Sequence, residues 1–88
     1  MNATGQAGTI KAVIEVVARA LTDRPDEVTV MESEHKGTTL VELYVAPGDL
    51  GKVIGKQGRT AAALRTLAAS AAERTGKTVT LEIRDGKP

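Results

Sequence analysis

The sequence predicts an α+β fold in which three helices cover one face of a three-stranded sheet, forming a two-layer sandwich. Two segments, residues 10–21 and 61–71, carry apolar residues at spacings of three and four, which is typical of amphipathic helices. Three other segments, residues 28–31, 38–45 and 78–83, alternate apolar and polar residues, which is typical of strands in a half-buried sheet. A short apolar turn and a glycine-containing loop precede the second long helix. The predicted order is therefore helix, strand, strand, helix, loop, helix, strand.

Length and composition point to one small domain. The chain has 88 residues, enough for a single modest core, and Tyr44 is its only aromatic residue, so that core must consist of Val, Ile, Leu and Ala. The lack of cysteine excludes a disulfide framework and a thiolate zinc site. We expect a flexible leader over residues 1–8, a domain over residues 9–84 and a tail over residues 85–88. Without an apolar membrane-length run or a signal-peptide pattern, we expect a cytoplasmic protein that does not associate with membranes.

The first helix is predicted by an apolar stripe that begins just after Thr9. The stripe contains Ile10, Val13, Ile14, Val17, Ala18 and Leu21. Pro25 ends this helix because proline disfavours the helical conformation of the residue before it. A strand over residues 28–31 follows, and the polar residues 32–37 are expected to form a hairpin connection.

The second strand covers residues 38–45 and places Val41, Leu43 and Val45 on one face. Its other face is more polar, which favours an antiparallel sheet that is covered on one side only. The third strand covers residues 78–83 and alternates in the same way.

The turn over residues 46–49 contains Pro and Asp, which are typical residues at the start of a helix. The short helix after it has an apolar face formed by Leu50, Val53 and Ile54. The second long helix is predicted from Thr60 to Arg74, and its apolar stripe contains Ala61, Leu64, Leu67, Ala68 and Ala71. Gly76 is expected to end it in a left-handed conformation.

The stretch from Gly51 to Thr60 is the candidate functional segment. Gly55 and Gly58 allow a sharp bend and the close approach of another backbone. All charges within the stretch are positive. Four basic residues and no acidic residue lie between residues 50 and 72, whereas seven acidic residues lie between residues 23 and 49. A nearly neutral chain of net charge +1 therefore gathers positive charge around one loop, which indicates an oriented field.

The segment Val53-Ile54-Gly55-Lys56-Gln57-Gly58 resembles the Val/Ile-Ile-Gly-x-x-Gly core of the KH-domain family, whose members bind single-stranded RNA or DNA. The wider run from Val45 to Arg65 is similar to the small stand-alone bacterial KH proteins of the KhpA/YlqC type. This likeness extends over roughly residues 9–84. The element order also resembles the type II arrangement of KH domains, in which the additional helix and strand come at the N-terminal side.

The resemblance implies that the Gly-x-x-Gly loop clamps the backbone of a single-stranded RNA. The first amides of the helix after the loop lack internal partners and can stabilise an anion, and the resemblance further implies an apolar groove for the bases with Ile54 as its floor. The predicted RNA-binding residues are Gly55, Lys56, Gln57, Gly58, Lys52, Arg59 and Ile54. Arg65 is expected on the surface rather than in the site. No catalytic residue, metal ligand or cofactor is predicted.

The chain departs from the family pattern at Ala61, where many KH domains carry Ile. This difference should alter the floor of the groove and weaken discrimination between bases. A single module that lacks an aromatic stacking platform should also bind weakly. We therefore expect weak, broadly specific binding of single-stranded RNA, as in an RNA chaperone or a post-transcriptional regulator.

Two alternatives belong to other functional classes. Gly51-x-x-x-Gly55-Lys56 is one residue shorter than a P-loop and has Gln57 where Ser or Thr would meet magnesium, so nucleotide hydrolysis is not expected. The second alternative is a protein-interaction module with a KH-like fold, in which RNA binding is secondary. The resemblance implies that such a module forms a homodimer, or a heterodimer with a larger KH-containing protein of the Jag type, and bears on cell growth and division. The sequence leaves RNA and single-stranded DNA undistinguished.

Overall fold

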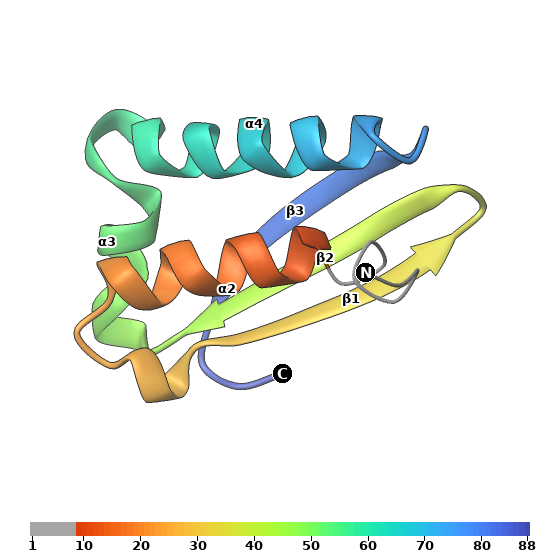
Figure 1. Ribbon diagram of the computed structural model, residues 1–88. Helices are drawn as coiled ribbons and strands as arrows, with labels where there is room; N and C mark the ends of the chain where they lie inside the picture. The colour runs from red at the N-terminus through yellow and green to blue at the C-terminus, as the bar shows by residue number, and fades with distance from the viewer. Residues whose placement is uncertain (1–8) are drawn as a thin grey trace.

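The computed structural model describes residues 9–88, so the predicted leader over residues 1–8 lies outside the described residues. The principal elements, in chain order, are α2 (Thr9–Leu21), β1 (Thr29–His35), β2 (Thr38–Val45), α3 (Leu50–Ile54), α4 (Arg59–Glu73) and β3 (Thr78–Asp85). Single turns of 3₁₀ helix occur at Pro25–Glu27, Pro47–Asp49 and Lys56–Gly58. The predicted α+β class and the order α-β-β-α-α-β are confirmed (Figure 1).

The sheet has the strand order β1-β2-β3, with β2 in the centre. β1 is antiparallel to β2, whereas β3 is parallel to β2, so the expectation of an antiparallel sheet is wrong for β3. The cause is the connection: β1 and β2 are joined by a tight hairpin, but α3 and α4 carry the chain back across the sheet before β3 begins. Val41 of the central strand lies opposite Glu32 on one side and Leu81 on the other.

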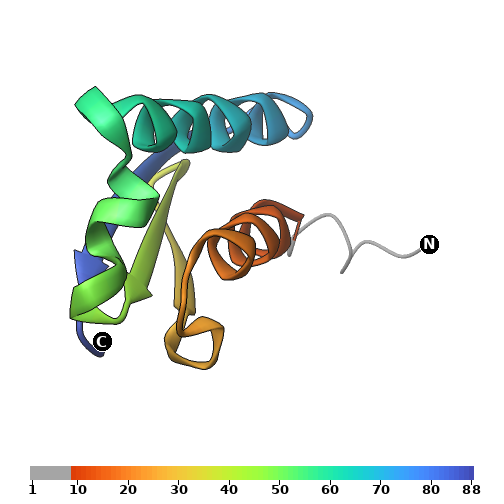
Figure 2. The ribbon, with the colours of Figure 1, turned by 90° about the vertical axis from the view of Figure 1, so that its left-hand side faces the viewer.

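The two long helices lie over the same face of the sheet, as Figures 1 and 2 show from two directions. Val41, Leu43 and Val45 of β2 point toward them and are fully buried, as the alternation predicts. The other fully buried large apolar side chains are Ile14 of α2, Val53 of α3 and Leu64 of α4. All three helices therefore contribute to one aliphatic core.

The predicted helix stripes are wider than the buried faces. Ile10, Ile14 and Ala18 are buried in α2, but Leu21 at the end of the helix is 38% exposed. In α4, Leu67 is 45% exposed although it lies on the predicted stripe. A helix packed on a sheet buries only the part of its apolar stripe that faces the strands, so the edges of both stripes remain open.

β1 is longer than predicted, because the polar residues after Met31 continue the strand to His35. Each of them pairs with a residue of β2, from Glu32 opposite Val41 to His35 opposite Thr38. The connection is only Lys36-Gly37, with φ values of 52° and 82°, as in the turns whose twist suits a two-residue hairpin. Alternation of apolar and polar residues did not predict this part of β1. Pairing between strands requires only backbone N–H and C=O groups, which polar residues supply as well as apolar ones.

Two backbone hydrogen bonds define the C-terminal end of α4. Gly76 is left-handed with φ of 70°, as predicted, and its N–H donates to the carbonyl of Glu73 at 3.1 Å. The N–H of Lys77 donates to the carbonyl of Ala72 at 3.1 Å, which completes a Schellman motif.

β3 runs to Asp85, two residues beyond the predicted end. Among residues 9–88, no helix has the length and apolar character needed to cross a membrane.

Candidate functional site

The segment Gly55–Gly58 connects α3 to α4, as the sequence predicts, and has an unusual backbone. Gly55 adopts φ 78° and ψ 170°, and its N–H donates to the carbonyl of Gly51 at 2.8 Å, which ends α3. One 3₁₀ turn follows, closed by a hydrogen bond from the N–H of Gly58 to the carbonyl of Gly55 at 3.1 Å. Gln57 and Gly58 both have positive φ, 57° and 73°. Three of the four loop residues therefore adopt conformations that side chains rarely allow.

The two loop glycines differ in their surroundings. A Cβ atom on Gly55 would lie 2.7 Å from Cβ and 2.9 Å from the backbone nitrogen of Thr60, so this glycine is required by the fold of the loop itself. A Cβ atom on Gly58 would meet no described atom within 4 Å. The open space beside the loop is therefore at Gly58, where the backbone of another molecule can approach.

The polar side chains of the loop are exposed to solvent. Gln57 and Arg59 contact each other, because Nη2 of Arg59 donates a hydrogen bond to Oε1 of Gln57 at 3.0 Å. Lys56 makes no ion pair with any residue that the structure describes. The first turn of α4 contains no acidic residue and Lys56 lies just before it, so this end of the helix is positively charged. Its first amide is not free, in contrast to what the sequence suggested, because the N–H of Arg59 donates to the carbonyl of Lys56 and closes the 3₁₀ turn.

Lys52 has a different environment from Lys56. Its ammonium nitrogen lies 3.2 Å from Oδ2 of Asp23 and 3.8 Å from Oδ1 of Asp49. An anion bound at the loop would compete with these two carboxylates for Lys52. The sequence suggested that Lys52 and Lys56 belong to one basic cluster. In the structure Lys52 pairs with carboxylates, whereas Lys56 is exposed to solvent.

A shallow pocket lies between α4 and β3, with a volume of about 240 Å³. It is lined by Arg65, Val79, Thr80, Leu81 and Glu82. β3 is an edge strand, so one side of its backbone has no strand partner among the described residues. Arg65, which sequence reasoning placed on the surface outside the site, thus contributes to a concave region beside the strand. Ile54, the predicted groove floor, is half-buried at the end of α3, and α3 and α4 both contact β3.

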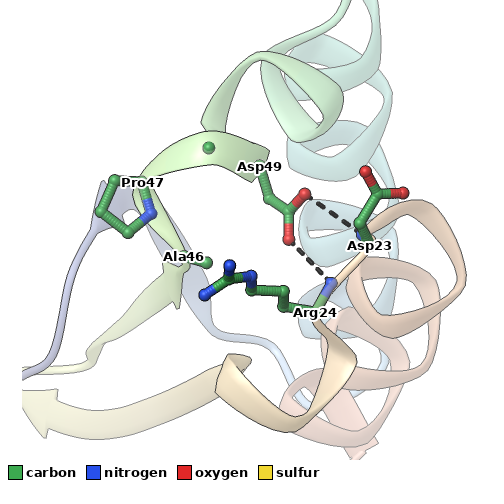
Figure 3. A pocket seen from close by; sticks show the side chains of 6 residues that line it. Asp23, Arg24, Ala46, Pro47 and Asp49 are labelled. Carbon is green, nitrogen blue, oxygen red and sulfur yellow. Dashed lines mark hydrogen bonds between the residues drawn. The ribbon is translucent and has the colours of Figure 1, made fainter.

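Sequence reasoning also missed the buried carboxylate of Asp49. Asp49 and Asp23 help line a second pocket, of about 330 Å³, between the start of α3 and the segment after α2 (Figure 3). The sequence offers no signal for this contact, because Asp23 and Asp49 are far apart in the chain. No group of three or more His, Cys, Asp or Glu side chains within residues 9–88 is placed to hold a metal ion.

Comparison with known proteins gives a consistent result. A family model described as "KhpA/KhpB, KH domain" matches residues 11–83. Aquifex aeolicus (strain VF5) has an RNA-binding protein KhpA that is 49% identical over 74 residues, covering 84% of this chain and 94% of the relative. The RNA-binding protein KhpA of Clostridium acetobutylicum is 49% identical over 74 residues, covering 84% of this chain and 99% of the relative. That of Treponema pallidum is 51% identical over 73 residues, covering 83% and 91%.

A solved structure shares the fold. The crystal structure of a variant of Aquifex aeolicus Era bound to GDP·AlF4− aligns with a TM-score of 0.61 and 17% sequence identity. The alignment covers 90% of this chain but only 31% of that chain, so this chain matches about a third of that larger protein. At this identity the likeness concerns the fold alone.

Proposed function

This chain belongs to the KhpA/KhpB KH-domain family, and from that membership we propose that it binds single-stranded RNA through the Gly55–Gly58 loop without catalysing a reaction. The observation that carries the proposal is the combination of open space at Gly58 with the ammonium group of Lys56, which makes no ion pair within residues 9–88. Relatives about half identical over most of the chain are named RNA-binding proteins, which supports RNA as the ligand class.

The phosphate backbone is the proposed ligand of the loop. An added Cβ atom at Gly58 would have no contact within 4 Å beyond its chain neighbours, so a phosphate can approach the start of α4, where the helix dipole favours an anion. Lys56 adds a mobile positive charge, and Gln57 adds an amide that can donate or accept. Arg59 can extend the site to a neighbouring phosphate only if it leaves Gln57. Lys52 can do so only if it leaves the two carboxylates that it now contacts.

The bases are proposed to lie along the region between α4 and β3. Unpaired bases are flat and can enter a shallow groove beside an edge strand, whereas a duplex cannot. Ile54 supplies an apolar surface next to the loop, and Arg65 and Glu82 supply polar groups along the pocket. Ala61 is buried and small where many KH domains have Ile, which supports broad rather than sharp base preference. Weak, broad binding fits an RNA chaperone or post-transcriptional regulator in the cytoplasm.

An NMR titration tests where the RNA lies. The ¹⁵N-labelled protein would be titrated with a short single-stranded RNA and with DNA of the same sequence. We expect amide shifts to concentrate in residues 52–60 and in the strand β3, with the RNA binding at least as tightly as the DNA. Shifts concentrated on α2 or on the open face of the sheet would contradict the proposed site.

Pairing with another KH protein is a second candidate function, supported by apolar side chains that remain exposed. Val16 of α2 is 69% exposed and Leu67 of α4 is 45% exposed. A homodimer, or a heterodimer with a larger KH-containing protein of the Jag type, would cover them and raise RNA affinity by linking two weak sites. If RNA binding disappears on dilution in step with the dimer, assembly is the primary function. Binding that persists in the monomer would make RNA recognition primary.

A further inference from the structure

The carboxylate of Asp49 is buried between two parts of the chain that are distant in sequence. Asp49 is only 3% exposed. Its Oδ1 accepts a hydrogen bond from the backbone N–H of Asp23 at 3.1 Å, and its Oδ2 accepts one from the backbone N–H of Arg24 at 2.9 Å. Figure 3 shows both bonds reaching from the segment after α2 to the residue that precedes α3. One side chain thus joins the segment after α2 to the start of α3.

This use of Asp49 is not the usual one for its position. An Asp immediately before a helix ordinarily accepts hydrogen bonds from the first amides of that same helix. Asp49 occupies this position before α3 but makes no capping bond to it. Both of its oxygens serve the neighbouring segment instead, so the side chain fixes α3 relative to the rest of the fold rather than stabilising α3 internally.

Lys52 supplies the charge that the buried carboxylate requires. A buried carboxylate is stable only when it is hydrogen-bonded and paired, and Lys52 lies 3.8 Å from Oδ1 of Asp49. The same ammonium lies 3.2 Å from Oδ2 of Asp23, whose side chain is 75% exposed. Lys52 therefore has one buried and one exposed carboxylate partner, and only the buried one also holds backbone amides.

The element that these contacts hold is too short to fix its own direction. α3 has five residues, whereas an isolated helix needs about 12–15 to be even marginally stable in water. Its orientation depends on tertiary contacts: Val53 is fully buried near its end, and Asp49 anchors its beginning. α3 ends at Gly55, so any change in its direction moves the loop that follows.

We infer that Asp49 is a positioning residue for RNA binding: it contacts no nucleotide, but its two hydrogen bonds to the segment after α2 fix the direction in which α3 presents the Gly55–Gly58 loop. This inference rests on the proposed function of that loop. It also assigns Lys52 first to the charge balance of the Asp23 and Asp49 carboxylates, and only secondarily to phosphate.

A pair of matched variants separates positioning from charge. Asp49→Asn and Asp23→Asn each remove one negative charge and one partner of Lys52, but only Asp49→Asn disturbs the hydrogen bonds to the backbone amides. Simple electrostatics predicts that both variants bind an anion more tightly. If Asp49 positions the loop, Asp49→Asn should instead bind RNA more weakly. Each protein would be titrated with the same short fluorescent RNA, at a temperature at which circular dichroism shows that all are folded.

We expect Asp49→Asn to weaken RNA binding about tenfold, and Asp23→Asn to bind at least as tightly as the unaltered protein. Without RNA, the NMR amide signals of residues 55–58 should move in Asp49→Asn and stay in place in Asp23→Asn. Equal affinities for the two variants would overturn the inference, and so would unmoved loop signals in Asp49→Asn. If Asp49→Asn does not fold, Asp49→Ser and Asp23→Ser provide the same comparison.

Failure of the proposed function has a different signature. If charge reversal within the loop leaves RNA binding unchanged, the loop is not the RNA site and the proposed function fails. In that case the NMR amide signals of residues 55–58 in Asp49→Asn still show whether Asp49 fixes the position of the loop. Moved signals would support the anchoring of the loop by Asp49, and unmoved signals would refute it.

Discussion

Thr60 occupies the space into which any side chain at Gly55 would project. A Cβ atom on Gly55 would lie 2.7 Å from Cβ of Thr60, and Gly55 also has φ of 78° and ψ of 170°, a region that only glycine adopts readily. Gly58 has positive φ as well, but the space beside it is open. The two glycines of the loop therefore have different tasks. Gly55 allows α4 to begin close to the end of α3, and Gly58 leaves room for a ligand.

The first prediction concerns these two glycines. Gly55→Ala should lower the free energy of unfolding by about 3 kcal/mol, because it combines a forbidden backbone conformation with a clash against Thr60. Gly58→Ala should lower it by only about 1 kcal/mol, the usual penalty for a left-handed residue, yet should weaken RNA binding. Urea unfolding followed by circular dichroism measures both losses. Similar losses for the two variants would show that the space around Gly58 is not open.

A second prediction concerns the dependence of RNA binding on salt. If three or four phosphates are neutralised, log K should fall with log[salt] with a slope of about −2 to −3. Lys56→Ala should reduce the magnitude of that slope by about 0.7, because Lys56 has no ion pair to give up among the described residues. Lys52→Ala should change the slope less, because its ammonium is shared with Asp23 and Asp49. Affinity that does not vary with salt would contradict a clamp based on phosphate contacts.

A third prediction concerns the core. Thr39 of β2 is 1% exposed, and its Oγ1 has no hydrogen-bond partner among the residues that the structure describes. Thr39→Val replaces this hydroxyl by a methyl group of similar size, so it should raise the free energy of unfolding by about 1 kcal/mol. The control is Thr38→Val, because the exposed hydroxyl of Thr38 lies 3.1 Å from that of Thr78. Equal changes in the two variants would mean that the Thr39 hydroxyl is satisfied in solution.

Local patterns in the sequence predicted most of the fold. The strand β2 was predicted with its observed bounds, because alternation at Val41, Leu43 and Val45 reports directly on which side chains face the helices. Gly76 was predicted as a helix end because glycine is favoured where the backbone becomes left-handed after a helix. The polar half of β1 could not be predicted, because its pairing depends on backbone groups that carry no sequence pattern.

The candidate site was only partly predictable. The loop was found because glycines at fixed spacing between apolar helical segments are a local signal. The pairing of Lys52 with Asp23 depends on how α2 packs beside α3, which spacing along the chain does not reveal. The same is true of Arg65, which lies beside β3 only because α4 packs across that strand. Contacts between distant segments are set by the assembled core, so they become visible only in three dimensions.

Charge reversal within the Gly55–Gly58 loop is the sharpest test of whether RNA binds there. The double variant Lys56→Asp, Gln57→Asp places two carboxylates where phosphate is proposed to bind, and Asp tolerates the positive φ of Gln57 better than most residues. The matched control is Lys36→Asp, Ser33→Asp, which makes the same change in net charge around the β1–β2 hairpin, at the opposite end of the molecule (Figure 1). Each folded protein would be titrated with a fluorescent single-stranded RNA at two salt concentrations. We predict that the loop variant loses RNA binding while the hairpin variant retains most of it. Equal binding by the two variants would show that the Gly55–Gly58 loop is only a turn between two helices.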